Sequence, residues 1–166
     1  MKEVSIESLQ LNPMTLISDE WMLLTAGTKE SGFNSMTCSW GHLGSIWGSY
    51  SAVCYVRPQR YTKEFVDRED LYTLSFFSED YKKDMAYIGS RSGRDEDKLA
   101  ATGLTPVFED GCTYYKEAKL VLVCRKLYRA PIKEEAFLDE EALSHYPEKD
   151  FHDMYIGRIE KVLVAD

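Results

Sequence analysis

The chain has no long hydrophobic run, no closely spaced pair of cysteines and no excess of basic residues. Crossing a bilayer as a helix takes about 20 consecutive apolar residues, and no segment approaches that length, so we expect no membrane association. Residues 1–20 contain four acidic side chains and no continuous apolar stretch. This composition argues against a signal peptide, and we expect a cytoplasmic protein.

The four cysteines, Cys38, Cys54, Cys112 and Cys124, include no CxxC motif. Their spacing gives no indication of a structural zinc site, and the three histidines are also scattered, so we expect no metal. In a cytoplasmic protein we expect these thiols to be reduced. Cys54 and Cys124 lie in apolar runs, where a thiol usually serves as a small buried hydrophobe.

Positive charge is scarce, with 20 basic against 28 acidic side chains and a formal net charge of −8. A nucleic-acid binder normally needs a concentrated basic face, so that class is disfavoured. Residues 133–153 hold eight acids and two lysines, which accounts for −6 of the total. The rest of the chain is therefore close to neutral and can still contain a local positive pocket.

A length of 166 residues fits one domain over 1–166, with an N-terminal arm at 1–20 and an acidic insertion at 131–150. Apolar and alternating runs predict strands over 21–28, 33–40, 51–56, 71–77, 105–109, 113–115, 119–128 and 151–164. Helices are predicted over 63–68, 80–88 and 95–102, with Thr62 and Asp95 as N-caps of the first and last. Residues 41–48 are predicted to form a glycine-rich loop. Seven or eight strands with few helices favour a mainly β fold, an antiparallel β-barrel with short helical insertions.

The predicted strand at 33–40 is unusually rich in small polar residues. In an extended chain Asn34, Met36, Cys38 and Trp40 share one face, and Ser35, Thr37 and Ser39 share the other. Such small side chains allow a flat polar ligand to approach the backbone. The alternative is an edge strand with exposed hydroxyl groups.

Two further stretches place cations just before predicted helices. Arg57-Pro58-Gln59-Arg60-Tyr61-Thr62 carries two guanidinium groups, and Ser90-Arg-Ser-Gly-Arg-Asp-Glu-Asp-Lys98 carries three cations. Helix N-termini and arginine forks both favour phosphate oxygens. Either stretch alone is typical of a solvated helix start. Together with the polar strand they predict a ligand with a phosphate at one end and a flat ring at the other.

These three stretches, in this order and with Leu74-Ser-Phe-Phe77 between them, resemble the flavin reductase-like FMN-binding split-barrel family, which includes flavoredoxin. The resemblance implies a six-stranded Greek-key antiparallel barrel that forms a homodimer, with one FMN per subunit near the interface. It implies that Asn34 and the backbone from Met36 to Trp40 line the isoalloxazine and ribityl chain. It further implies that Arg60, Tyr61 and Thr62 lie at the ribityl–phosphate end, with Ser90, Arg94 and Lys98 on the phosphate. The implied cofactor-binding set is Asn34, Ser35, Met36, Thr37, Cys38, Ser39, Trp40, Arg60, Tyr61, Thr62, Ser90, Arg94 and Lys98.

Because a flavin carries out the redox chemistry itself, no catalytic side chain is expected. The first hypothesis is an NAD(P)H:flavin reductase that passes electrons through FMN to a flavin, ferric iron or protein acceptor. NADH and NADPH stay open, since the chain has no GxGxxG motif. The second is a flavoredoxin-like electron-transfer protein whose acidic segment docks a basic partner. The third is a barrel that binds a ligand without redox chemistry.

Three further side chains carry open hypotheses. Cys38 either tunes the flavin or is simply small enough to let the ring approach. His42, in the glycine-rich segment, either reaches the ligand or a partner subunit or is exposed. His152 could meet the flavin of a neighbouring subunit, and His145 is expected to be solvated.

Overall fold

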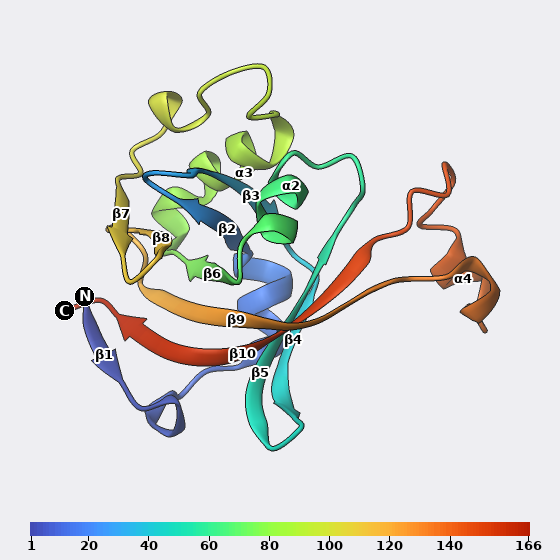
Figure 1. The fold of residues 1–166 in the computed structure, drawn as a ribbon, viewed down its shortest axis with the longest axis horizontal. Coiled ribbons are helices and arrows are strands. Elements are labelled where there is room, and N and C mark those ends of the chain that lie inside the picture. Colours follow the sequence, from blue (N-terminus) through green and yellow to red (C-terminus); the bar gives the residue numbers. More distant parts are fainter.

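The computed structural model describes residues 1–166 and has ten strands, eight of them in one antiparallel sheet (Figure 1). Along this sheet the order is β3 (Gly32–Cys38), β2 (Met22–Thr28), β6 (Leu71–Phe76), β9 (Leu120–Pro131), β10 (Asp153–Val164), β5 (Ser49–Val56) and β4 (Gly41–Ile46), and β1 (Lys2–Val4) also pairs with β10. The sheet is strongly curved but does not close, because β3 and β4 do not pair. The prediction of a mainly β, antiparallel split barrel is confirmed, with eight strands in the sheet.

The long strands β9 and β10 lie near the middle of the sheet and pair with each other along most of their length. Their pairing contains two register shifts, one of them between Ile156 and Gly157. A Cβ atom at Gly157 would lie 2.3 Å from the Tyr72 hydroxyl, so only glycine fits against that buried ring. The side chains inside the curved sheet form a core cluster of 20 buried residues. This core supports one end of β3 and β5, where the candidate site lies.

Short helices and turns fill the connections. The predicted helices at 63–68 and 80–88 are confirmed as α2 (Thr62–Arg68) and α3 (Lys82–Ser90). The N-terminal arm contains α1 (Pro13–Thr15) and a turn of π-helix over Leu16–Glu20. The acidic insertion leaves the sheet between β9 and β10 and contains α4 (Glu140–Leu143) (Figure 1). No helix combines the length and the apolar character that a membrane span requires.

The strands β7 (Pro106–Glu109) and β8 (Cys112–Tyr115) pair only with each other, in a separate two-stranded sheet. The buried side chains of β8 belong to a second core cluster of 12 residues, which also contains Met85 and Ile88 of α3. This cluster holds α3 against the outer face of the sheet and so fixes the turn that follows the helix.

The prediction of a loop at 41–48 is wrong. Residues 41–46 form β4, which pairs with β5 in a hairpin whose turn residues are Trp47 and Gly48. Both turn residues have positive φ, at 52° and 70°, as a type I′ turn requires in a two-residue hairpin. Gly41 and Gly44 conceal the strand in the sequence because they interrupt its alternation of side chains.

Two predicted helix starts also differ. Residues 95–98 are irregular, and only Leu99–Ala101 is helical, as a single 3-10 turn. The carboxylate that accepts from the first free N–H groups belongs to Asp97, at 3.1 Å from Leu99 N, and not to Asp95. Thr62 is the first residue of α2 and makes no capping bond. Its hydroxyl instead accepts a hydrogen bond from the side chain of Asn34.

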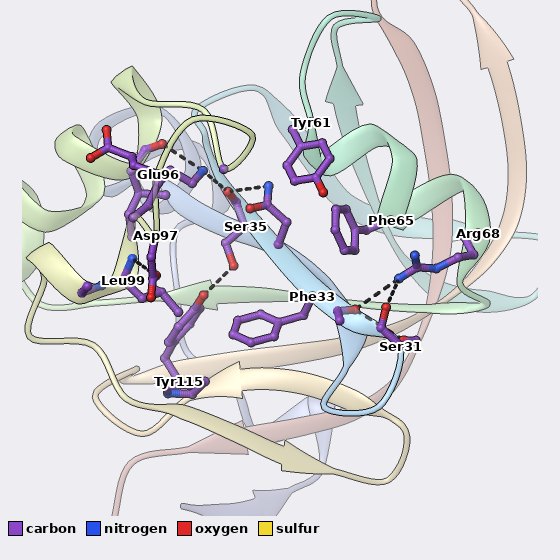
Figure 2. Close-up of a pocket in the computed structure, with 17 residues that line it drawn as sticks. Ser31, Phe33, Ser35, Tyr61, Phe65, Arg68, Glu96, Asp97, Leu99 and Tyr115 are labelled. Carbon is purple, nitrogen blue, oxygen red and sulfur yellow. Dashed lines mark hydrogen bonds between the residues drawn. The ribbon is translucent and has the colours of Figure 1, made fainter.

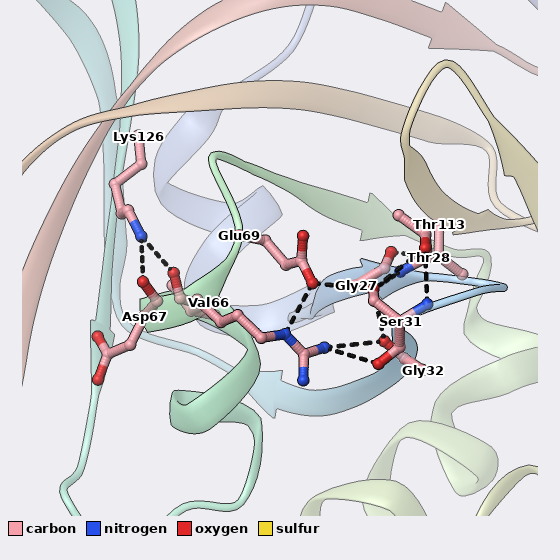
Figure 3. Close-up of polar contacts among 10 residues, drawn as sticks. Gly27, Thr28, Ser31, Gly32, Val66, Asp67, Glu69, Thr113 and Lys126 are labelled. Carbon is pink, nitrogen blue, oxygen red and sulfur yellow. Dashed lines mark hydrogen bonds and ion pairs between the residues drawn. The ribbon is translucent and has the colours of Figure 1, made fainter.

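Two cations fix α2 against its surroundings (Figure 3). Lys126 of β9 donates to the carbonyl oxygens of Val66 and Asp67, at 2.6 and 2.9 Å, which satisfies the end of the helix. Arg68 donates to the carbonyl oxygens of Ser31 and Gly32 in the β2–β3 turn, at 3.0 and 3.1 Å. The helix is therefore tied to both β9 and β3, and its first residues are held beside the polar strand.

Candidate functional site

Two adjoining cavities lie where the polar strand β3 meets the two cationic turns. The first, which we call the strand-end cavity, has a volume of about 300 Å³ and is lined by residues 36–40 with Tyr55, Arg57, Arg60, Gly89 and His152. The second, the turn cavity, has a volume of about 190 Å³ and is lined by residues 59–62 and 90–93 with Asn34, Met36 and Lys98. Met36 and Arg60 line both, so the two cavities form one groove.

Arg60 and Lys98 give the groove uncompensated positive charge. Arg60 donates to the carbonyl oxygen of Gly89 at 3.0 Å, and Lys98 Nζ donates to the carbonyl oxygens of Ser35 and Ile88 at 2.5 and 3.3 Å. Neither forms an ion pair with a carboxylate, whereas the neighbouring Arg57, Arg91 and Arg94 each do.

Lys98 is only 6% exposed, and burial, followed by the charge of Arg60, lowers its pKa to about 8. A charged ammonium group with only neutral partners is costly inside a protein. An anion in the turn cavity would supply the missing countercharge for both side chains, and a phosphate group has the right charge and acceptor geometry.

The backbone of the second turn packs directly on β3. Asn34 donates to the hydroxyl of Thr62 at 2.8 Å, which joins the strand to the start of α2. A Cβ atom at Gly93 would lie 2.3 Å from Asn34 Oδ1 and 3.2 Å from the Tyr61 ring. All three stretches that the sequence singled out therefore meet at Asn34.

The strand-end cavity combines aromatic rings with a neutral histidine. Trp40 is 41% exposed, and its ring centroid lies 5.0 Å from that of His152. His152 is buried, and its Nδ1 lies 2.9 Å from the Tyr146 hydroxyl. Burial lowers the pKa of His152 to about 4, so its imidazole is neutral at pH 7. The cavity can therefore accept an uncharged ring system.

Cys38 contributes its side chain to the core cluster. Burial raises the pKa of its thiol to about 12, with a smaller opposing effect of Arg60. The thiol therefore stays protonated at neutral pH, which disfavours a nucleophilic role because the thiolate is the reactive form. The structure supports the reading of Cys38 as a small residue beside the site.

Eleven of the thirteen residues predicted to bind cofactor line the groove, and Ser35 and Arg94 do not. The Ser35 hydroxyl points to the opposite face, where it bonds to Thr25 and Tyr115 at 2.7 and 2.5 Å. The Arg94 guanidinium lies over the Tyr61 ring, 4.7 Å from its centroid, and forms an ion pair with Glu64. Both stay near the groove, and Ser35 still contributes the carbonyl group that holds Lys98.

Sequence reasoning missed Tyr55 and Gly89 as lining residues. Tyr55 is an ordinary strand residue that reaches the groove through the pairing of β5 with β10, and no local pattern marks it. Gly89 marks a close approach, since its Cβ would lie 3.1 Å from Thr37. His152 lines the groove of its own chain, and its contact with the flavin of a neighbouring subunit stays a prediction. His42 faces Tyr55 outside this groove, and His145 is exposed as expected.

The largest cavity, of about 760 Å³, adjoins the turn cavity (Figure 2), and Asn34, Tyr61, Gly93 and Lys98 line both. Its lining includes Phe33, Phe65 and Tyr115, together with the carboxylates of Glu96 and Asp97. Its arginine, Arg68, already pairs with Glu69. Lys98 faces both spaces, but only the groove adds Arg60, and no carboxylate lines the turn cavity. Because Glu96 and Asp97 repel an anion in the largest cavity, the groove is the better phosphate site.

The comparisons with known proteins identify the family to which this split barrel belongs. Residues 14–166 match the family described as the flavin reductase like domain. The chain thus belongs to the flavin reductase-like FMN-binding split-barrel family. No curated protein sequence matches it.

Among solved structures, the flavoredoxin of Desulfovibrio vulgaris (Miyazaki F) is similar at 23% identity and a TM-score of 0.69, covering 100% of this chain and 78% of that one. A protein with a split barrel domain from Shewanella frigidimarina NCIMB 400 is similar at 20% identity and a TM-score of 0.70, covering 97% and 77%. An FMN-binding protein from Thermus thermophilus is similar at 18% identity and a TM-score of 0.68, covering 99% and 80%. At these identities the similarities establish the fold.

Proposed function

We propose that the protein is an FMN-binding oxidoreductase that passes electrons from a reduced nicotinamide through bound FMN to an acceptor. The observation that carries this proposal is the pair Arg60 and Lys98, two cations without carboxylate partners in a groove that continues along β3. Membership of the flavin reductase-like family supports the flavin, and the charge of the groove supports a phosphate-bearing form of it.

In this proposal the turn cavity holds the phosphate and the strand-end cavity holds the ring. Arg60 offers a guanidinium fork, Lys98 an ammonium group and Ser90 a hydroxyl to the phosphate oxygens. Residues 36–40 would line the ring, and Trp40 and His152 would exclude water beside it. Bound FMN supplies the redox chemistry. The protein would orient the ring, and because hydride transfer from the donor goes directly to the flavin, no acid or base on a side chain is required.

A flavoredoxin-like electron-transfer protein, which holds FMN without using NAD(P)H directly, is the second candidate. The observation that favours it is the exposed acidic insertion, in which Glu134, Glu135, Asp139, Glu140 and Glu141 all face solvent. Such a segment can steer a basic partner protein to the site by long-range attraction. In either case we propose a homodimer, as the family resemblance implies.

The first experiment measures the affinity for FMN by titration of the purified protein, followed by the flavin absorption spectrum. Lys98→Met and Arg60→Gln should each raise the Kd for FMN by roughly tenfold or more, because each removes a charged hydrogen bond to phosphate. Arg125→Ala is the matched control, since Arg125 lies on β9 and pairs with Glu160. Equal FMN affinity in all four proteins would refute the placement of the phosphate.

The pH dependence of the same titration tests whether the ammonium group of Lys98 binds the phosphate. Burial lowers the pKa of Lys98 to about 8 in the free protein, so the ammonium group is lost as the pH rises through that value. FMN affinity should fall above about pH 8 in the native protein. In Lys98→Met this fall should be absent.

Stopped-flow mixing then separates the two candidate functions. If the protein is a reductase, NADH or NADPH should bleach the flavin absorption of the FMN-loaded protein within the time of a catalytic turnover. A flavin that stays oxidised with both nucleotides, yet is reduced by a strong chemical reductant, would favour the electron-transfer protein.

A further inference from the structure

A third cavity lies beside Trp40, between the N-terminal arm and the β4–β5 hairpin. It has a volume of about 530 Å³, and its apolar wall includes Pro13, Met14, Ile17, Leu43 and Ile132. We call it the arm cavity. We propose that it binds an uncharged ring compound that carries a carbonyl group, and that this compound is the electron acceptor.

The position of the arm cavity points to a redox partner of the flavin. Ser39, Trp40 and Tyr55 line both the arm cavity and the strand-end cavity, so the two spaces adjoin at these residues. A ring in the arm cavity would therefore lie next to the ring position in the groove. This step rests on the proposed function, whereas binding in the arm cavity can be tested without flavin.

The lining determines the charge of the ligand. No lysine, arginine, aspartate or glutamate lines the arm cavity. Phosphate groups of a dinucleotide would have no cation to pair with there, and burying an unpaired charge is costly. Met14 is 74% exposed at the rim, where it adds apolar surface for an incoming ring. The cavity therefore favours an uncharged and largely apolar molecule.

One polar pair in the lining can orient a bound ligand. The Tyr55 hydroxyl lies 3.4 Å from His42 Nδ1, and the two rings meet edge to face with centroids 5.8 Å apart. Burial raises the pKa of Tyr55, so its phenol stays protonated. When His42 carries its proton on Nδ1 and donates to the phenol oxygen, the Tyr55 hydroxyl is free to donate to a ligand. The matching group on the ligand is a carbonyl oxygen, as in a quinone or an aryl ketone.

The electron transfer balances for a quinone. The quinone gains two electrons and two protons from reduced FMN and becomes a hydroquinone, while the flavin returns to its oxidised form. A reduced nicotinamide dinucleotide, the donor in the proposed function, reduces the flavin again. No other oxidant or reductant is needed.

Binding is tested with two ligands of the same shape, 2-acetylnaphthalene, which is uncharged, and 6-acetyl-2-naphthoate, which carries a carboxylate. Each is titrated into flavin-free and FMN-loaded protein and followed by tryptophan fluorescence. We expect the uncharged ketone to bind at least tenfold more tightly than the carboxylate in both forms of the protein. Equal affinity of the two ligands, or binding of neither, overturns the proposal.

Two substitutions locate the ligand. Ser18→Trp fills the arm cavity from an exposed position and should raise the Kd for the ketone at least tenfold. Thr15→Trp is the control, because Thr15 is exposed on the same arm but does not line the cavity, and it should leave this Kd within about twofold. Tyr55→Phe should raise the Kd for the ketone roughly fivefold, because it removes one hydrogen bond. An unchanged Kd in Ser18→Trp would place the ligand elsewhere and overturn the proposal.

The affinity for FMN is measured in the same variants. If Ser18→Trp keeps native FMN affinity and loses the ketone, the arm cavity is a separate site. If the native protein binds FMN but not the ketone, and Ser18→Trp changes the sedimentation coefficient, a second copy of the chain covers the arm cavity and the proposal fails. With duroquinone as acceptor, FMN-loaded protein and NADH should produce hydroquinone more slowly in Ser18→Trp than in Thr15→Trp.

Discussion

Arg60 and Lys98 illustrate how individual side chains can be held in an unfavourable state by the fold. Both donate to backbone carbonyl groups, and these neutral acceptors fix the positions of the cations without cancelling their charge. Carboxylates nearby are occupied by other arginines, such as Glu64 by Arg94. The result is a local positive potential in a protein whose net charge is −8.

His152 gives a prediction for stability. Burial lowers its pKa in the folded protein from 6.5 to about 4, so between these values the unfolded chain binds more protons than the folded one. Stability therefore rises with pH across this window and is lost as the pH falls from 6.5 to 4, by up to about 3 kcal/mol from this group. Urea unfolding at several pH values should show a smaller loss in His152→Gln than in the native protein. His145→Gln, at an exposed position, should lose as much stability between pH 6.5 and 4 as the native protein does.

Among the elements, the turn over residues 90–93 depends on its contact with β3. Gly93→Ala places a methyl group 2.3 Å from Asn34 Oδ1, so either the turn or the asparagine must move. We expect a loss of about 1–3 kcal/mol in the free energy of unfolding and a weaker affinity for FMN. Gly44→Ala is the control, because no atom lies within 4 Å of the added Cβ, and it should change stability by less than about 0.5 kcal/mol. Equal behaviour of the two variants would show that the close approach at Gly93 has no effect.

At the scale of the whole molecule, the groove exists only when segments far apart in sequence are folded together. Asn34, Arg60, Lys98 and His152 all line it, from four different parts of the chain. FMN should therefore bind the folded state and not the unfolded chain. At 100 times its Kd it should raise the free energy of unfolding by about 2.7 kcal/mol. Riboflavin, which lacks the phosphate, should stabilise less at the same concentration in urea unfolding curves.

Much of this arrangement could be predicted from the sequence. The strands around 22–28, 71–76 and 120–131 are long or strongly apolar, so hydrophobic patterning alone marks them. The polar strand and the two cationic turns also stand out, because their composition departs from what packing requires. Where local pattern failed, as for β4, glycines had interrupted the alternation of side chains.

The sequence by itself determined the mainly β class, the cationic turns and most of the residues that line the groove, since these depend on local composition and on the order of motifs. Only the tertiary structure decided which cations lack carboxylate partners, and which aromatic residues meet at the end of β3. Ion pairs such as Arg94 with Glu64, and the approach of Tyr55 to His152, join residues 30 and 97 positions apart. Contacts of that kind are set by strand pairing and packing, which no local pattern records.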